Sequence, residues 1–508
     1  GNVVFKTKNG GTDWEVISPD LTRNNKSQQV PGGIPFTNEA AGGENYNTLM
    51  SLVASPHDPD VLWAGSDDGL IHITRDGGET WINSTPKGLK EGIINSIEVS
   101  PHNPETAYVV VMRYKFMDLK PYIYKTTDYG ENWDLITDGI DGEHNFVRVV
   151  REDPKVPGLL YAGTETGFYI SLNDGKYWES FQNNLPIVPI NDLYIQDNDL
   201  IAATAGRSFW ILDDLSPIQQ SPKDISVHLV TPKKSYRLSS GKTPKNSTQG
   251  TNPMSGVYLD YYLSEVHDSL EVKIDILQGD QIIRSYTSKK DSLFKLWPGG
   301  PSPKTILQHK KGFNRTHWDF RREQLPSVDK VFVYGSYQGS LVAPGIYSAK
   351  LTYGEEVKKV DIEILPNPNM DYSAADFEAQ QNLLVKIEKA IKKIHYSVSE
   401  MRDVQNQLNH YIKILNGKEK YNVIYDQALA IKKRLNEWET KLIQPNQKTF
   451  QDVINFNNML NAQFMHLKAF VDADDPELTQ GAKQRYKDLI VIWSKYKTEL
   501  DQVINNDF

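Results

Sequence analysis

The sequence contains no cysteine among its 508 residues. This absence excludes disulfide bonds, thiolate zinc sites and cysteine nucleophiles, although it does not fix the cellular compartment. No stretch of about 18 apolar residues occurs, so we expect no membrane span. Phosphate-binding glycine loops and nucleophile motifs are also missing, and we expect no cofactor and no metal. The net charge of −9 argues against a nucleic-acid partner.

A short motif occurs four times in the first 180 residues. The copies are TKNGGTDW at 7–14, TRDGGETW at 74–81, TTDYGENW at 126–133 and SLNDGKYW at 171–178. The shared pattern, Ser/Thr-x-Asp/Asn-x-Gly-x-x-Trp, is the Asp-box or BNR repeat. The acidic or amide side chain can accept hydrogen bonds in a turn, the glycine permits a positive φ, and the tryptophan can pack on the hairpin. We predict structural roles for Asn9, Trp14, Asp76, Trp81, Asp128, Trp133, Asn173 and Trp178.

The spacing of the copies, about 45 to 67 residues, suits the four-stranded blades of a β-propeller. The second copy shows all four strands, which we predict at 49–54, 61–65, 70–74 and 80–84. Further blades are predicted at about 94–137 and 147–182, and one without an Asp-box at about 188–215.

The opening stretch, 3–18, contains only the last two strands of a blade. We therefore expect residues 1–216 to form the C-terminal blades of a β-propeller whose first blade is incomplete. The remaining blades would be carried by a partner polypeptide. A small ring of four blades, closed by the N-terminal strands, is the alternative.

The hydrophobic pattern of the remaining sequence changes twice, first at about residue 217 and again at about residue 371. Residues 217–370 alternate apolar and polar side chains and predict an Ig/fibronectin-III-like β-sandwich. From Ser373, which forms a capping box with Asp376, the period becomes helical for about 40 residues and stops at Asn416-Gly417. Three shorter helices follow, so that 371–508 predicts an antiparallel four-helix bundle. Their apolar residues are Leu435 and Trp438, then Phe456, Leu460 and Phe464, and then Leu489, Trp493 and Tyr496.

Several longer runs carry a resemblance to a known group of proteins. They are SPDLTRNNKSQQ at 18–29, LWAGSDDGLIHITRDGGETW at 62–81, VVREDPKVPGLLYAGTETGFY at 149–169 and GRSFWILDDL at 206–215. The chain resembles the C-terminal half of exported bacterial propeller proteins described as sortilin-like or "glycosyl hydrolase, BNR repeat". The resemblance implies a propeller and export to the periplasm, outer-membrane surface or cell exterior. It does not imply a sorting receptor, because the cysteine-rich module of sortilin is absent.

Candidate site residues lie in loops that an up-and-down blade places on one face. These are the turns after each blade's second strand and the loops that lead into its first strand. We predict that this rim gathers Asp67, Asp68, Arg113, Tyr114, His144, Glu165 and Arg207.

Each candidate has a catalytic or binding interpretation and a structural one. Asp67 with Glu165 could form the carboxylate pair of a glycoside hydrolase. Asp68 in its Asp-Asp-Gly turn and Arg207 beside two aromatic residues favour structural roles. Arg113, Arg148 and Arg207 are similar to the arginine cluster of sialidases, but no partner tyrosine and acid accompany them. His144 favours a hydrogen-bonded loop histidine, and the acidic run 472–475 lacks the glycine and spacing of a calcium loop.

Three functional hypotheses follow. The first is a non-catalytic exported or cell-surface protein that binds a protein or glycan partner on the propeller rim. The second is a glycoside hydrolase with its carboxylate pair on the same rim. The third is an accessory subunit of an outer-membrane assembly, docked through the helices.

Overall fold

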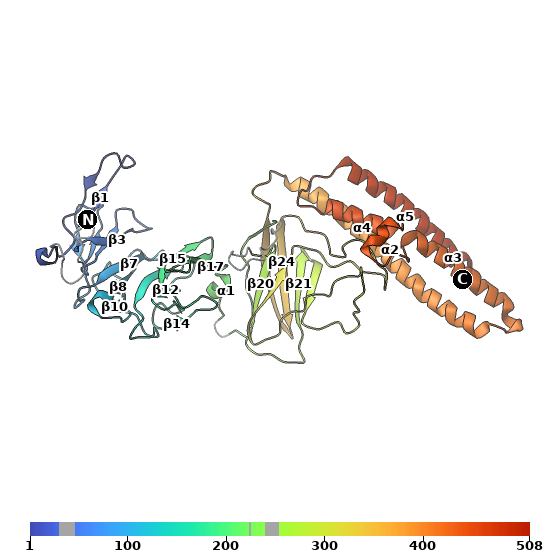
Figure 1. The fold of residues 1–508 in the computed structure, drawn as a ribbon, viewed down its shortest axis with the longest axis horizontal. Helices are drawn as coiled ribbons and strands as arrows, with labels where there is room; N and C mark the ends of the chain where they lie inside the picture. The colour runs from blue at the N-terminus through green and yellow to red at the C-terminus, as the bar shows by residue number, and fades with distance from the viewer. Residues whose placement is uncertain (30–45, 223–224, 239–252, 508) are drawn as a thin grey trace. The chain divides into compact units, whose positions relative to one another are not determined.

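The computed structural model describes residues 1–29, 46–222, 225–238 and 253–507. The chain divides into two compact units, Gly1–Gln219 and Gln220–Phe508 (Figure 1). The first consists of small antiparallel sheets, and the second combines two larger sheets with helices.

The described residues of the first unit form five sheets in chain order, and each is a meander of sequence neighbours. Sheet 1 is the hairpin β1 (Phe5–Lys6) and β2 (Glu15–Val16). Sheet 2 consists of β3 (Leu49–Ala54), β4 (Leu62–Ser66), β5 (Ile71–Thr74) and β6 (Ile82–Asn83). Sheet 3 consists of β7 (Ile93–Val99), β8 (Ala107–Met112), β9 (Ile123–Thr126) and β10 (Asp134–Leu135). Sheet 4 consists of β11 (Val147–Glu152), β12 (Leu160–Thr164), β13 (Phe168–Ser171) and β14 (Glu179–Ser180).

Sheet 5 has three strands, β15 (Ile190–Gln196), β16 (Asp199–Thr204) and β17 (Phe209–Leu212), and the short helix α1 (Ser216–Gln219) follows. The first strand of each of sheets 3, 4 and 5 packs on the first two strands of the sheet before it. Four-stranded meanders stacked in this way have the form of propeller blades. The predicted strand at 49–54 is confirmed residue for residue, and the other predicted strands of sheet 2 are shifted or shortened by one or two residues at their ends.

The Asp-box turns have the predicted hydrogen bonds. In the second copy, Asp76 Oδ1 accepts from the Thr80 backbone N–H at 2.9 Å and from Thr74 Oγ1 at 2.7 Å. Hydrogen bonds from Thr80 and then from Thr74 lower the pKa of Asp76 to about 2. Asn9, Asp128 and Asn173 each accept from the backbone N–H four residues later in the same way.

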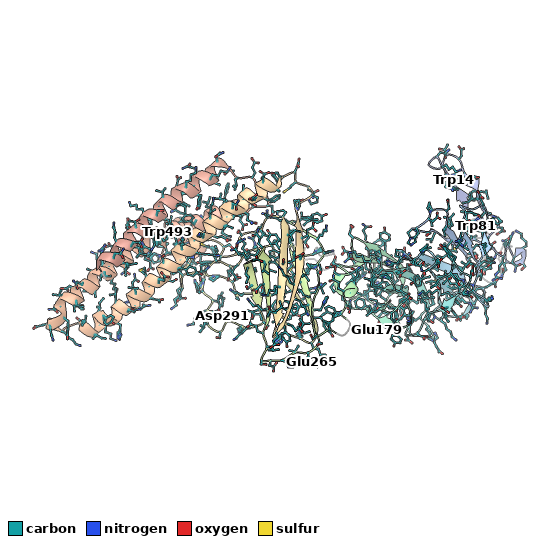
Figure 2. All side chains as sticks on the ribbon, turned by 180° about the vertical axis from the view of Figure 1, so that it is seen from behind. Trp14, Trp81, Glu179, Glu265, Asp291 and Trp493 are labelled. Atoms are coloured by element: carbon teal, nitrogen blue, oxygen red, sulfur yellow. The ribbon has the colours of Figure 1, made fainter. Side chains whose placement is uncertain are left out.

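The Asp-box tryptophans differ from the expectation that each packs on its own hairpin. In three copies the indole Nε1 donates to a backbone carbonyl at the end of the preceding sheet. The pairs are Trp81 with Ile17 at 2.8 Å, Trp133 with Ser84 at 2.7 Å and Trp178 with Ile136 at 2.7 Å. Trp14 instead donates to Gly11 within its own turn and is 60% exposed, whereas Trp81 is partly buried (Figure 2). The motif therefore links neighbouring sheets.

The second unit begins with a two-layered β-sandwich. One sheet consists of β18 (Val227–Leu229), β20 (Val257–Leu263) and β23 (Gly312–Trp318). The other has the order β19 (Ser235–Tyr236), β25 (Glu356–Leu365), β24 (Gly345–Tyr353), β21 (Val272–Gln278) and β22 (Gln281–Thr287). Their facing sides share one apolar core around Tyr261, Ile274 and Trp318.

Four α-helices follow, α2 (Ala374–Leu415), α3 (Asn422–Leu442), α4 (Leu460–Val471) and α5 (Gln480–Asp507). Single turns of 3-10 helix occur at Lys26–Gln28, Tyr114–Phe116, Glu419–Tyr421 and Phe450–Ile454. The capping box of Ser373 and Asp376 is confirmed, and α2 ends directly before Asn416 as predicted. The third predicted helix begins later than expected and excludes Phe456, because Asn457 and Asn458 lie between it and the helix and asparagine favours turns over helix interiors.

The helices share their core with a segment that precedes them. Leu325, Val328, Val331, Val333 and Tyr337 pack with the buried face of α2 and with the other helices. Charged groups add to this junction: Arg321 forms an ion pair with Asp472 at 2.7 Å, and the Ser340 N–H donates to Glu388 at 2.6 Å. Sandwich and helices therefore form one compact unit. Among the described helices, none is long and apolar enough to cross a membrane.

Candidate functional site

The predicted rim loops come together at one end of the sheets of the first unit. Each turn after a second strand bonds to the loop that enters the first strand of the same sheet. The N–H groups of Asp67, Glu165 and Ala205 donate to the carbonyls of Thr48, Phe146 and Pro189 at 2.9, 3.0 and 2.9 Å. The structure thus groups the candidate residues by sheet.

Asp68 is fully buried and holds its sheet's entering segment in place. Its Oδ2 accepts from the Arg23 backbone N–H and from Asn47 Nδ2, both at 2.7 Å, and its Oδ1 accepts from Ser66 Oγ at 2.5 Å. Arg23 Nε also donates to the Asp68 carbonyl at 2.9 Å. A buried carboxylate with three donors is a structural anchor, so Asp68 presents nothing to a ligand.

Asp67, the neighbouring carboxylate, is half-buried. Its oxygens accept from the Thr48 backbone N–H at 2.9 Å and from Thr48 Oγ1 at 3.3 Å. Burial is the main cause that raises the pKa of Asp67, and the negative charge of Asp68 raises it further. A raised carboxyl pKa is the property of a general acid, but this carboxyl is already engaged by Thr48.

Glu165, the second carboxylate of the predicted pair, binds Arg148. The Arg148 Nε and Nη2 lie 2.7 and 2.6 Å from Glu165 Oε2. Asp67 belongs to sheet 2 and Glu165 to sheet 4, with sheet 3 packed between these sheets. Each carboxylate is bound within its own sheet, and the structure shows no contact between the two among the described residues.

The arginines of the rim do not form a carboxylate-binding cluster. Arg113 forms an ion pair with Asp118 and donates from Nε to the Glu91 carbonyl at 3.0 Å. Arg148 is occupied by Glu165. The exposed Arg207 donates from Nη1 to the Gly206 carbonyl at 2.9 Å. Arg207 also takes part in a local turn, in which Trp210 Nε1 donates to the Arg207 carbonyl at 3.1 Å.

Several apolar and aromatic side chains are exposed on the rim. The Tyr114 ring stacks on Phe146 with centroids 5.4 Å apart, and His144 lies exposed two residues before Phe146. Met117, Ile187 and Phe209 are also exposed, and the sequence argument missed all three. Apolar residues inside loops that join strands are the signal that could have identified them.

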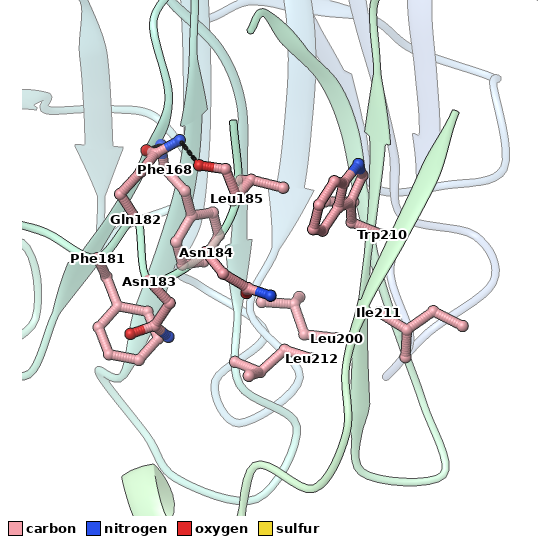
Figure 3. Close-up of a pocket in the computed structure, with 11 residues that line it drawn as sticks. Phe168, Phe181, Gln182, Asn183, Asn184, Leu185, Leu200, Trp210, Ile211 and Leu212 are labelled. Atoms are coloured by element: carbon pink, nitrogen blue, oxygen red, sulfur yellow. Dashed lines mark hydrogen bonds between the residues drawn. The ribbon is translucent and has the colours of Figure 1, made fainter. Parts of the chain in front are cut away.

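A small apolar crevice lies between sheets 4 and 5. Phe168 and Phe181 face Leu200, Leu212 and Trp210 across it (Figure 3). Its volume of about 60 Å³ is far below the several hundred Å³ of a small-molecule site. In the described part of the chain, no three His, Asp or Glu side chains form a group that could hold a metal ion.

The first strand of each of sheets 2 to 5 has one residue at an equivalent position. This residue is buried in sheets 3, 4 and 5 but exposed in sheet 2. In each first strand this residue lies just after a bulge and pairs with the middle of the second strand: Leu52 with Ala64, Ile97 with Val109, Val150 with Ala162 and Leu193 with Ala202. Ile97, Val150 and Leu193 are 3%, 0% and 1% exposed because each packs on the preceding sheet. Leu52 is 51% exposed. Met50 lies on the same side of β3 as Leu52 and is 54% exposed. We call the surface of Leu52 and Met50 the open face.

No protein-family description matches the chain, and no curated protein matches it. Among solved structures, the chain is similar to YCF48 bound to D1 peptide, with 19% identity over 32% of this chain and 55% of that chain and a TM-score of 0.25. It is also similar to the GH74 enzyme of Niastella koreensis, with 13% identity over 51% of this chain and 32% of that chain and a TM-score of 0.29. The GH74 xyloglucanase of Xanthomonas campestris has 13% identity over 70% of this chain and 61% of that chain, with a TM-score of 0.33. At these scores the likeness assigns no activity.

Proposed function

We propose that this protein is a non-catalytic interaction protein that binds another polypeptide through its first unit. The observation that carries the proposal is the state of the rim carboxylates. Asp68 is buried under three donors, Asp67 is held by Thr48 and Glu165 is held by Arg148. Exposed apolar side chains, by contrast, lie on the rim and on the open face. Exposed apolar surface is typical of interaction sites.

The partner of the open face is a polypeptide that carries further sheets of the same repeat. Three successive sheet junctions bury the residue equivalent to Leu52, and three bond the Asp-box tryptophan to a carbonyl of the sheet before it. Within the described residues, Leu52 is not buried by a preceding sheet, and Trp14 forms no hydrogen bond to a preceding sheet. A sheet with a free carbonyl at the end of its last strand would supply them.

The resemblance of residues 18–29 and 206–215 to exported propeller proteins supports a location outside the cytoplasm. On this proposal the protein acts in the periplasm, at the outer-membrane surface or outside the cell.

Charge substitution on the open face tests the proposal. Leu52→Asp should abolish co-purification of a repeat-bearing polypeptide with the tagged chain, because it places a carboxylate in an apolar contact. Ile82→Asp is the matched control, since Ile82 is 60% exposed on the same sheet but lines the groove toward sheet 3. The two variants should have the same thermal unfolding as the wild type. Equal recovery of the partner with both variants would contradict the proposal.

A glycoside hydrolase is the second candidate, and the raised pKa of Asp67 is the observation that favours it. Polysaccharide hydrolysis by the wild-type chain that disappears in Asp67→Asn would establish this alternative. Hydrolysis that Asp67→Asn leaves intact, or none at all, would remove Asp67 as its acid.

A further inference from the structure

The second unit contains a cleft that the proposed function does not use. It lies under residues 288–306, which are part of the segment that joins β22 to β23, and its other walls are residues 323–329 and one face of α2. Its volume of about 710 Å³ is within the range of sites that hold small molecules or short oligomers.

The loop over the cleft is fastened at several points. Its ends meet where the Leu307 N–H donates to the Thr287 carbonyl at 2.9 Å. Gln324 Nε2 donates to the Ser302 carbonyl at 2.9 Å, and Trp297 Nε1 donates to the Val331 carbonyl at 3.0 Å. The cleft is therefore preformed, which lowers the entropic cost of binding.

Positive charge gathers in this cleft although the whole chain is acidic. Five lysines from the loop and from α2 line it: Lys289, Lys290, Lys295, Lys304 and Lys392. Lys304 pairs with Glu323 at 2.9 Å. The other four form no ion pair within the described residues, and the remaining acids of the lining are Asp291, whose Oδ1 accepts from the Leu293 N–H at 2.9 Å, and Asp329. Four unpaired ammonium groups against two carboxylates leave a net positive lining.

Aromatic rings stand among the lysines. Phe294, Trp297 and Tyr396 line the same cleft. Tyr396 is exposed and lies one helical turn after Lys392, so the two side chains share one face of α2. An aromatic ring beside an ammonium group offers a flat apolar surface and a point charge within one ligand's reach.

We propose that this cleft binds an anionic oligosaccharide. The lysines would pair with carboxylate or sulfate groups of the sugar, and the rings would contact the apolar C–H faces of the pyranose units. Among the described residues that line the cleft there is no arginine, so no planar bidentate pairing is required of the anion. The lining comes mainly from loops and one helix, and it includes Thr287 at the end of the edge strand β22. The Thr287 carbonyl already accepts from the Leu307 N–H, so it is not open to an extended peptide.

The test is isothermal titration calorimetry of the full chain with a hexasaccharide of galacturonic acid and with a chondroitin sulfate hexasaccharide. Binding of either is expected at low ionic strength and should weaken as salt is added, because exposed charge pairs are screened. Lys289→Glu with Lys290→Glu should weaken binding about tenfold, since two attractions become repulsions. The control is Lys310→Glu with Lys311→Glu, an adjacent pair of exposed lysines outside the cleft with the same change in net charge.

The comparison separates every outcome. Weakened binding in the cleft pair and binding within about twofold of wild type in the control pair would support the proposal. Equal loss in both pairs would show that only overall charge matters and would overturn it. No binding of either hexasaccharide, or tighter binding of a polyglutamate peptide or an oligothymidylate of equal charge, would also overturn it. Variants of Leu52 should not change this binding, so its failure is distinct from failure of the proposed function.

Discussion

At the residue scale, the two adjacent acids of one turn show how position decides the role of a carboxylate. Asp68 turns inward and holds residues 21 and 45 positions away in the sequence, whereas the half-buried Asp67 binds Thr48. The turn itself was predictable, because Asp-Asp-Gly has local turn chemistry. The Asp68 partners Arg23 and Asn47 were not, because they are distant in the sequence. The Asp-box acids were predictable for the opposite reason, since all their donors lie within four residues.

Glu98 on β7 gives the first unit a pH-dependent contribution to stability. Burial raises the pKa of Glu98 to about 7, although Arg151 lies 3.5 Å away and opposes the shift, while Glu152 and Asp192 add to it. Between the ordinary pKa of a glutamate and about 7, the folded state holds a proton that the unfolded state has lost. Stability from this group therefore falls as pH rises through that window.

Glu98→Gln should remove this dependence. Between pH 5 and pH 8, the melting temperature of the first unit should fall by about 5–10 °C more in the wild type than in the variant. Differential scanning calorimetry at both pH values measures the difference. Parallel pH profiles for the two proteins would show that Glu98 titrates normally.

At the scale of single elements, the sequence predicts what local periodicity controls. The strand at 49–54 and the helix at 374–415 follow from alternation, from the capping box and from the stop at Asn416-Gly417. The role of the Asp-box tryptophans did not follow, because the acceptor of each indole belongs to a different sheet. The sequence of the motif alone does not identify the carbonyl group in the adjacent sheet to which its indole donates.

The tryptophan contacts predict that substituting Trp133 destabilises the first unit more than substituting Trp14. Trp133→Phe keeps a ring near Trp63 but loses the hydrogen bond to the Ser84 carbonyl between sheets 2 and 3. The loss should cost about 1 kcal/mol, which lowers the melting temperature of the first unit by about 2–4 °C. Trp14→Phe is the control and should have little effect on the isolated chain, because Trp14 bonds only within its exposed turn. Equal destabilisation by both substitutions would count against a role between sheets.

At the scale of the whole molecule, the structure has two compact units where composition suggests three regions. Residues 325–337 have the character of sandwich loops, yet their apolar side chains belong to the helical core. No local sequence pattern predicts that residues 325–337 pack in the helical core, because this packing depends on helices that begin some 40 residues later. Strand order fixes which turns of one sheet share an end, and in sheets 2, 4 and 5 the turn bonds to the entering loop of the same sheet. The catalytic interpretation of the rim depended on distances that the sequence does not contain.

The open face carries the central claim, that the first unit binds a polypeptide with further sheets of the same repeat. The most direct measurement replaces Leu52 with the photo-crosslinker p-benzoylphenylalanine in the source cells and identifies the crosslinked peptide by mass spectrometry, with Ile82 as the control position. The account predicts a crosslink from position 52 to a peptide outside these 508 residues that lies in a Ser/Thr-x-Asp/Asn-x-Gly-x-x-Trp repeat sheet, and none of this kind from position 82. Crosslinks from position 52 only to this chain, only to proteins without the repeat, or to nothing would contradict it.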